Sequence, residues 1–198
     1  MAGGVGIDSD GHGHSDCVDR LGHGTAVAAA IHEKAPDAVL LVAKVFDRSL
    51  SASVTALVAA IDWAIRRRVG LVNLSLGTSD AEHEAALRGA VERAVEAGVV
   101  IVAAIDEKGP RWLPGSLPGV VPVQLDWDCP RDEIRAVHGG GSWSLKASGY
   151  PREIPGVPRE KNLKGISFAV ANATGVLACL LEALPGASLG DLRARLQA

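Results

Sequence analysis

The spacing of apolar residues changes repeatedly along this chain between two patterns. Short runs rich in Val, Ile and Leu predict strands at 5–8, 39–45, 71–77, 99–104 and 119–125. Longer segments in which apolar residues recur about every 3.6 positions predict helices at 24–34, 51–68, 81–98 and 165–184. Strands that alternate with helices in this way are typical of an α/β fold. We therefore expect three layers, a mostly parallel central sheet with helices on both faces.

Two regions towards the C-terminal end complete the pattern. Residues 126–164 hold many Gly, Pro and charged residues, which predicts a hairpin and loops. Residues 188–198 predict a short amphipathic helix. Because no repeat, low-complexity tract or linker interrupts the 198 residues, we expect a single domain over 1–198.

Composition narrows the classes of function. Hydrophobic residues make up 47% of the chain, which predicts a packed core rather than disorder. The formal net charge of −3, with both signs interspersed, favours neither a nucleic-acid partner nor a membrane surface. The N-terminal residues lack the features of a signal peptide, and no uncharged apolar stretch approaches the length of a membrane span. We therefore expect a cytoplasmic protein.

The cysteines agree with that location. Cys17, Cys129 and Cys179 are an odd and sparse set without the spacing of metal ligands, so they predict free thiols. Cys179 lies in the apolar run GVLACLLEAL, where we expect it to be part of the core.

Three polar side chains stand at the edges of apolar elements. Asp8 follows the first strand in GIDSD, His23 opens a helix in GHGTAVAAAI, and Ser167 opens another in GISFAVANATG. A serine hydroxyl is a weak nucleophile until a histidine takes its proton. The histidine in turn needs a carboxylate that fixes its tautomer and stabilises its charged form. Taken singly, each motif also fits a turn or a helix cap.

Taken together, in the chain order Asp, His, Ser, these motifs resemble those of the subtilisin-like serine peptidases. The resemblance extends over nearly the whole chain and includes LVNLSLG and WLPGSLPGVVPV. It implies that Asp8 orients His23, that His23 is general base and then acid, and that Ser167 forms an acyl-enzyme.

The same resemblance implies a peptide or protein substrate and no cofactor. The substrate would pair as an extended strand with Ser75, Leu76 and Gly77. Ala104 and Ile105 correspond to residues that line the first specificity pocket of the family. Ile105 stands where the family has a glycine, so we expect a narrowed pocket.

Other departures from the family pattern concern the oxyanion and the nucleophile. Asp106 in AAIDEKG takes the position of the asparagine whose amide donates a hydrogen bond to the oxyanion. An ionised carboxylate has no proton to donate, whereas a protonated one does. Ile166 replaces the threonine before the nucleophile, and Ala171 replaces a proline four residues after it. We expect attenuated catalysis, and an altered balance between water and an amine as acceptor of the acyl group.

The segment GHGHSD is a further candidate site. It places His12 and His14 beside Asp8, Asp10 and Asp16, a composition compatible with a metal ion. Because no rigid frame is visible in the sequence, a flexible polar loop is the favoured interpretation, and we expect no metal.

These observations favour a serine endopeptidase that processes a specific peptide or protein. Two alternatives stay open. One is a non-catalytic module of the same fold that binds a peptide or a partner protein. The other is a relative that transfers the acyl group to an amine. The sequence leaves the oligomeric state undetermined.

Overall fold

The structure is a computed structural model that describes residues 3–106, 109–139, 142–184, 186–187 and 189–197. Its strands are β1 (Gly3–Ile7), β2 (Gly13–His14), β3 (Leu41–Lys44), β4 (Leu71–Leu74), β5 (Val100–Ala104), β6 (Val120–Leu125), β7 (Arg135–Gly139) and β8 (Ser142–Ala147). Its α-helices are α1 (His23–Lys34), α2 (Val54–Arg66), α3 (Glu84–Glu96), α4 (Ile166–Ala183) and α5 (Leu189–Gln197), with short 3-10 turns at Ala81–His83 and Arg159–Lys161.

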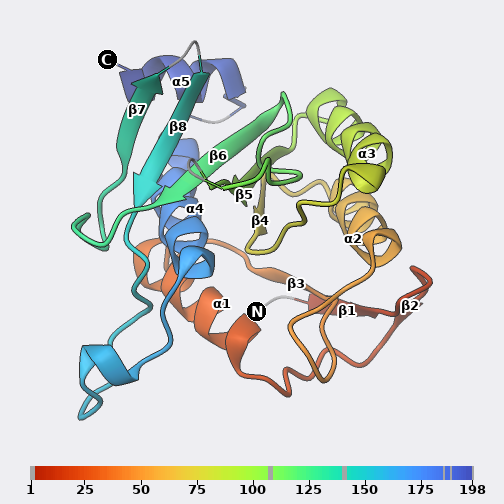
Figure 1. Ribbon diagram of the computed structural model, residues 1–198, viewed down its shortest axis with the longest axis horizontal. Coiled ribbons are helices and arrows are strands. Elements are labelled where there is room, and N and C mark those ends of the chain that lie inside the picture. The colour runs from red at the N-terminus through yellow and green to blue at the C-terminus, as the bar shows by residue number, and fades with distance from the viewer. Residues whose placement is uncertain (1–2, 107–108, 140–141, 185, 188, 198) are drawn as a thin grey trace.

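The strands form two sheets (Figure 1). Five of them follow the order β4-β5-β6-β8-β7, in which β4, β5, β6 and β8 are parallel and β7 closes an antiparallel hairpin with β8. The other three follow the order β2-β1-β3, with β1 parallel to β3. The prediction of a mostly parallel sheet is thus confirmed, and so is the hairpin. The division into two sheets is a feature that the sequence pattern did not predict.

Strand β2 explains part of that division. Residues 13–14, predicted to belong to a flexible loop, pair antiparallel with the end of β1, in the register Gly6 with His14 and Ile7 with Gly13. This pairing uses the edge of β1 that faces away from β3. In the described part of the chain, no ladder joins β1 to β4, so Asp8 follows a strand of one sheet and Ser75 a strand of the other.

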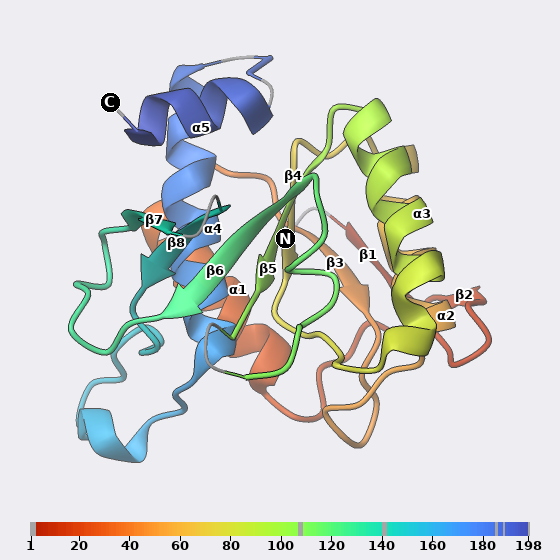
Figure 2. The ribbon, with the colours of Figure 1, turned by 45° about the horizontal axis from the view of Figure 1, so that its top comes forward.

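Helices cover both faces of the sheets (Figure 2). On one side α2 and α3 bury Ile61 and Leu87 against Ile101 of β5. On the other side α4 and α5 bury Leu177 and Leu192 against β5, β6 and β8, and α1 packs on α4. The three predicted layers are therefore confirmed. They form because each helix and each sheet has an apolar face that has to be buried against another element.

Helix α4 is the apolar centre of this arrangement. Of the helices described, it is the one long and apolar enough to cross a membrane by length and composition, and half of it is buried inside the structure. Its small residues Ala169, Ala171 and Ala173 are fully buried, which lets α1 and the sheet approach closely. Cys179, predicted to be in the core, is instead exposed, and its Sγ lies 3.0 Å from the carbonyl oxygen of Lys34.

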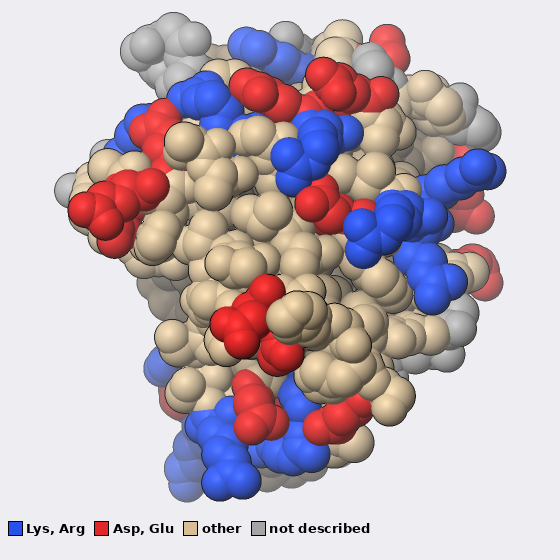
Figure 3. All heavy atoms as spheres, turned by 90° about the vertical axis from the view of Figure 1, so that its right-hand side faces the viewer, with Lys and Arg blue, Asp and Glu red and all other residues tan. Residues whose placement is uncertain are grey.

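The surface carries charges of both signs. On the face shown in Figure 3, basic and acidic side chains lie near one another and are separated by uncharged areas. Ion pairs join neighbouring elements, such as Arg93 of α3 with Asp62 of α2 at 2.9 Å. A mixed surface of this kind is consistent with the small net charge.

Candidate active site

Ser167 stands in the first turn of α4, at the end of the helix that faces the carboxyl end of β4. The N-cap residue of α4 is Gly165, whose φ is 142°. This backbone conformation is strained for residues with a side chain. The first N–H groups of a helix have no carbonyl one turn earlier to bind. The N–H of Ser167 is one of these groups, and such N–H groups at the N-terminus of a helix stabilise a negative oxygen.

A pair of reciprocal hydrogen bonds ties Ser167 to Ser75. Ser75 Oγ donates to the carbonyl oxygen of Ser167 at 2.9 Å, and Ser167 Oγ donates to the carbonyl oxygen of Ser75 at 3.2 Å. Behind Ser75, Asn73 Nδ2 donates to Ser75 Oγ at 2.9 Å, and Thr174 Oγ1 lies 3.0 Å from Asn73 Oδ1. A partly buried chain of polar groups thus holds Ser167 against β4, and we call Asn73, Ser75, Ser167 and Thr174 the Ser167 network.

His23 is the first residue of α1 and is half-buried between two phenylalanines. Its ring centroid lies 6.0 Å from that of Phe168, the residue after Ser167, and 6.2 Å from that of Phe46. Burial lowers the pKa of His23 below its usual value, against the opposing effect of the Asp19 charge. His23 is therefore neutral at neutral pH, which is the form that a general base requires.

Asp19 fixes the start of the helix that carries His23. The N-cap residue, Gly22, has no side chain that could accept a hydrogen bond from the N–H groups at the start of the helix. The Asp19 carboxylate accepts these hydrogen bonds instead. Oδ1 accepts from the N–H groups of Leu21 and Gly22, and Oδ2 accepts from the N–H and hydroxyl of Thr25, both at 2.7 Å. Burial acts to raise the pKa of Asp19, but these hydrogen bonds outweigh it and the pKa is lowered. Asp19 is thus the acid whose charge acts on His23.

Asp8 is engaged elsewhere. Its Oδ1 accepts from the N–H of His12 at 2.8 Å and of Asp10 at 3.0 Å, and its Oδ2 lies 3.7 Å from His12 Nδ1. The hydrogen bond from the His12 backbone lowers the pKa of Asp8. The side chain is exposed, and it lines a cavity of about 480 Å³ together with Phe46, which also contacts His23. We call residues 8–12 the Asp8 loop.

The structure brings these predicted residues only partly together. Ser167 lies beside Ser75, and His23 lies beside the residue that follows Ser167. Within the described ranges, no hydrogen bond joins His23 to Ser167 or to Asp8, although the notional triad requires both. The triad therefore stays a prediction.

The predicted substrate-binding residues lie on two neighbouring strand ends. Leu76 and Gly77 continue from β4, and the N–H of Ile105 continues the ladder of β5 by donating to Val123 at 2.8 Å. Ala104, the last residue of β5, is buried. Because β4 and β5 are adjacent and parallel, both segments meet at one edge of the sheet.

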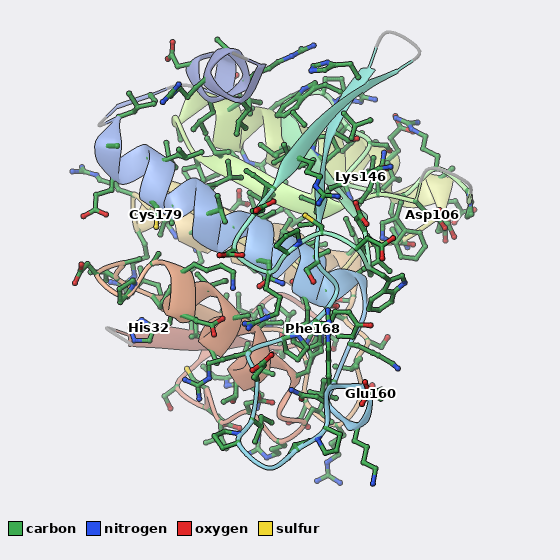
Figure 4. The ribbon with its side chains drawn as sticks, turned by 90° about the vertical axis from the view of Figure 1, so that its left-hand side faces the viewer. His32, Asp106, Lys146, Glu160, Phe168 and Cys179 are labelled. Atoms are coloured by element: carbon green, nitrogen blue, oxygen red, sulfur yellow. The ribbon has the colours of Figure 1, made fainter. Side chains whose placement is uncertain are left out.

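Asp106 follows at the same edge and is exposed. Figure 4 shows Asp106 on the loop after β5, and Phe168 near the start of α4. The two residues after Asp106 in the AAIDEKG segment, Glu107 and Lys108, lie outside the described residues.

Sequence reasoning missed residues that the structure places at the site. Asn73 and Trp112 lie within the segments LVNLSLG and WLPGSLPGVVPV, and Asp19 lies four residues before His23. A polar residue inside an otherwise apolar strand is a signal that could have singled out Asn73. Nothing local marks Trp112, whose position depends on a distant glycine.

The Asp8 loop also contains the one group of potential metal ligands found in the described residues. Ligand atoms of Asp8, Asp10 and His12 lie within 4.8 Å of one another, and all three residues are exposed. His14 belongs to β2, and Asp16 pairs with Arg20 and Lys44, so neither joins the group. Two backbone N–H groups, those of Asp10 and His12, donate to one carboxylate oxygen of Asp8.

Comparison with known proteins identifies the family. The sequence profile of the subtilase family of S8 peptidases matches residues 5–125, more than half of the chain. The chain belongs to the subtilase family. The thermostable alkaline protease of Halalkalibacterium halodurans is 30% identical to it over 199 residues, which cover 90% of this subtilase and 52% of that protein. This subtilase thus spans about half of the length of that relative.

Solved structures agree with this assignment. A cold-adapted subtilisin-like serine proteinase superposes with a TM-score of 0.72 at 22% identity, over 96% of this subtilase and 71% of that chain. The prenylagaramide maturation protease PagA superposes with a TM-score of 0.63 at 26% identity, over 91% of this subtilase and 74% of that chain. The predicted subtilisin-like fold is thereby confirmed.

Proposed function

We propose that this subtilase is a serine endopeptidase in which Ser167 is the nucleophile and His23 the general base. The observation that carries the proposal is the placement of Ser167. Its hydroxyl lies at the N-terminus of α4, 3.2 Å from the backbone of the strand end that would bind substrate, with a neutral histidine beside the next residue. Family membership supports the same activity.

The substrate itself would release the nucleophile. An extended peptide that pairs with Ser75–Gly77 donates its own N–H to the carbonyl oxygen of Ser75. That carbonyl is the acceptor of the Ser167 hydroxyl in the free protein. Once it is taken, the hydroxyl turns to His23, whose imidazole accepts the proton as Ser167 attacks the peptide carbonyl carbon. Catalytic hydrogen bonds are commonly loose in the free enzyme and close in the complex.

The remaining steps use the same groups. The N–H of Ser167 donates to the oxyanion of the tetrahedral intermediate, and His23 returns the proton to the leaving amine as the C–N bond breaks. A water molecule, deprotonated by His23, then attacks the acyl carbon. The bond from that carbon to Ser167 Oγ breaks, and His23 returns the proton to Ser167 as the acid product leaves. Asp8 orients His23. To do so, the Asp8 carboxylate must give up its hydrogen bonds to the N–H groups of Asp10 and His12 and turn towards the imidazole.

A peptide precursor is the proposed substrate. PagA is named as a maturation protease, and its fold matches over 91% of this subtilase. The exposed carboxylate of Asp106 at the oxyanion position is a feature of an attenuated enzyme, which suits limited cleavage of one precursor better than bulk digestion.

Covalent labelling tests the proposal. A fluorophosphonate probe phosphonylates an activated serine, so the wild type should be labelled at Ser167, and Ser167→Ala should abolish the label. Ser75→Ala is the matched control, because it removes the neighbouring hydroxyl and should leave the labelled peptide the same in mass spectrometry.

Two other outcomes decide between the alternatives. A folded wild type that no probe labels and that binds peptides would be a binding module. The lack of a hydrogen bond between His23 and Ser167 in the described residues favours that interpretation. A labelled protein that, with a peptide amine present, forms a ligated product in place of the free acid would be an acyltransferase.

A further inference from the structure

Trp112 lies directly on the strand end where the substrate is proposed to bind. A side chain at Gly77 would overlap the indole: a Cβ built there falls 2.7 Å from Trp112 Cδ1, closer still to Nε1, and 2.6 Å from the carbonyl oxygen of Leu113. Real Cβ atoms do not approach other heavy atoms that closely, so only glycine fits at 77. The space above Gly77 is therefore filled by the edge of the indole.

The segment that carries Trp112 is held in place by its neighbours. Leu113 and Thr78 form an antiparallel bridge, in which the N–H of each donates to the carbonyl oxygen of the other at 2.8 and 2.9 Å. The N–H of Ser116 closes a turn by donating to the carbonyl oxygen of Trp112 at 2.9 Å. Leu113 itself is almost fully buried, at 2% exposure. Trp112 thus belongs to a fixed turn.

The same turn also contacts the second strand end of the site. A Cβ at Gly115 would fall 2.8 Å from Ile105 Cγ2 and would overlap the carbonyl of Ala104. Trp112 is half-buried and packs against the apolar cluster that includes Ala104 and Ala169. Residues 112–115 therefore lie between Ser75–Gly77 and Ala104–Ile105. Two cavities of about 400 and 480 Å³ lie elsewhere, and Trp112 lines neither.

We propose that Trp112 fills the first specificity pocket and restricts the residue before the scissile bond to Gly or Ala. The proposal rests on the proposed function. A substrate strand beside Ser75–Gly77 directs the side chain of that residue, P1, into the space between the two strand ends. The indole already occupies this space, so a larger side chain meets atoms rather than a cavity. Ile105, packed on Gly115, contributes to the wall.

The size of the effect follows from how pockets discriminate. One methylene more or fewer in a hydrophobic pocket changes kcat/KM by about 10–200-fold. Removing the indole opens room for several such groups. Trp112→Gly should therefore raise kcat/KM for P1 Phe relative to P1 Ala by on the order of 10²-fold or more.

The experiment compares peptides that differ only at P1, with Gly, Ala, Leu or Phe. The wild type should cleave only the Gly and Ala peptides, whereas Trp112→Gly should also cleave those with Leu and Phe. Trp63→Ala is the matched control, because it removes an indole from α2 on the far side of the sheet and should leave the P1 preference unchanged. Trp112→Leu keeps an apolar side chain and should admit Leu but not Phe, which preserves the test if the glycine variant fails to fold.

Indole added to Trp112→Gly gives a second readout. Free indole should occupy the cavity, so it should inhibit cleavage of the Phe peptide competitively and leave cleavage of the Ala peptide unchanged. A merely structural role for Trp112 would not produce this selectivity.

The outcomes separate this inference from the proposed function. A wild type that prefers Leu or Phe at P1 overturns the inference and leaves the peptidase in place. So does a fluorophosphonate-labelled Trp112→Gly or Trp112→Leu whose P1 preference equals that of the wild type. If the wild type cleaves no peptide and takes no label at Ser167, the proposed function itself fails.

Discussion

Ser167 and Asp8 both stand at the carboxyl side of the sheets, but their surroundings differ. Ser167 is half-buried and belongs to a chain of hydrogen bonds that reaches through Asn73 to Thr174, inside the five-stranded part of the fold. Asp8 is exposed, and its hydrogen bonds go to the two residues Asp10 and His12 that follow it closely in the chain. One group is held by tertiary contacts and the other by its own loop.

The difference indicates where this site is already arranged for reaction. The Ser167 network holds Ser167 against the end of β4 before any substrate binds, so that in the proposed reaction only the Ser167 hydroxyl has to turn. In the proposed reaction, the Asp8 carboxylate must give up its hydrogen bonds to Asp10 and His12 before it can orient His23. In the free protein, the charge that acts on His23 is that of Asp19.

The strongest test of the comparison is Asp8→Asn. If the Asp8 loop rearranges during the reaction, the amide favours the wrong imidazole tautomer and kcat/KM should fall by about 10⁴-fold. The measurement is kcat/KM on one cleavable peptide. Asp10→Asn removes the same charge from the same loop and should change it little. Equal activity of both variants would assign no chemical role to the loop and would leave Asp19 as the acid of the site.

Asp106→Asn tests the loop after β5, which lies next to the residues proposed to bind the substrate beside Ser167. An amide donates a hydrogen bond to the oxyanion where a carboxylate repels it, so kcat/KM at neutral pH should rise by up to about 10²-fold. Asp128→Asn, which removes an exposed charge between β6 and β7, is the control and should have no effect. Identical pH profiles of wild type and Asp106→Asn would mean that Asp106 does not face the oxyanion.

Asn73→Asp tests whether the Ser167 network positions the nucleophile. The carboxylate still accepts from Thr174 but no longer donates to Ser75 Oγ, so kcat should fall about 10-fold, the equivalent of one hydrogen bond, with KM nearly constant. Thr174→Val removes only the far end of the network and should have a smaller effect. A fall in thermal stability without a change in kcat would show that Asn73 supports the fold alone.

The smallest expected effect is a shift in pH dependence from Asp19→Asn. A general base acts only when neutral, so kcat/KM should rise with pH through the pKa of His23, which burial places below the usual value. The Asp19 charge opposes that lowering, so its removal should move the rising limb to still lower pH. Asp16→Asn, a neighbouring acid paired with Arg20 and Lys44, is the control. If kcat/KM of Asp19→Asn rises over the same pH range as that of the wild type, Asp19 is excluded as a partner of His23.

Much of the fold was predictable because its causes are local. Helices α2 and α4 lie within two or three residues of their predicted ends, since their apolar periodicity and flanking residues act over single turns. Strand β4 ends at Leu74 rather than at 77, because Ser75 turns to Ser167 and Thr78 pairs with Leu113. Such pairings depend on residues far away in the chain.

The sequence by itself determined the three layers and the family, because apolar periodicity and short motifs carry that information. Only the tertiary structure decided which acid lies near His23, that β2 pairs with β1, and that Trp112 covers Gly77. Each of these depends on where a loop lies against a distant backbone. The physical reason is that loops, unlike helices and strands, take their positions from the hydrogen bonds and packing that surround them rather than from a repeating pattern of their own.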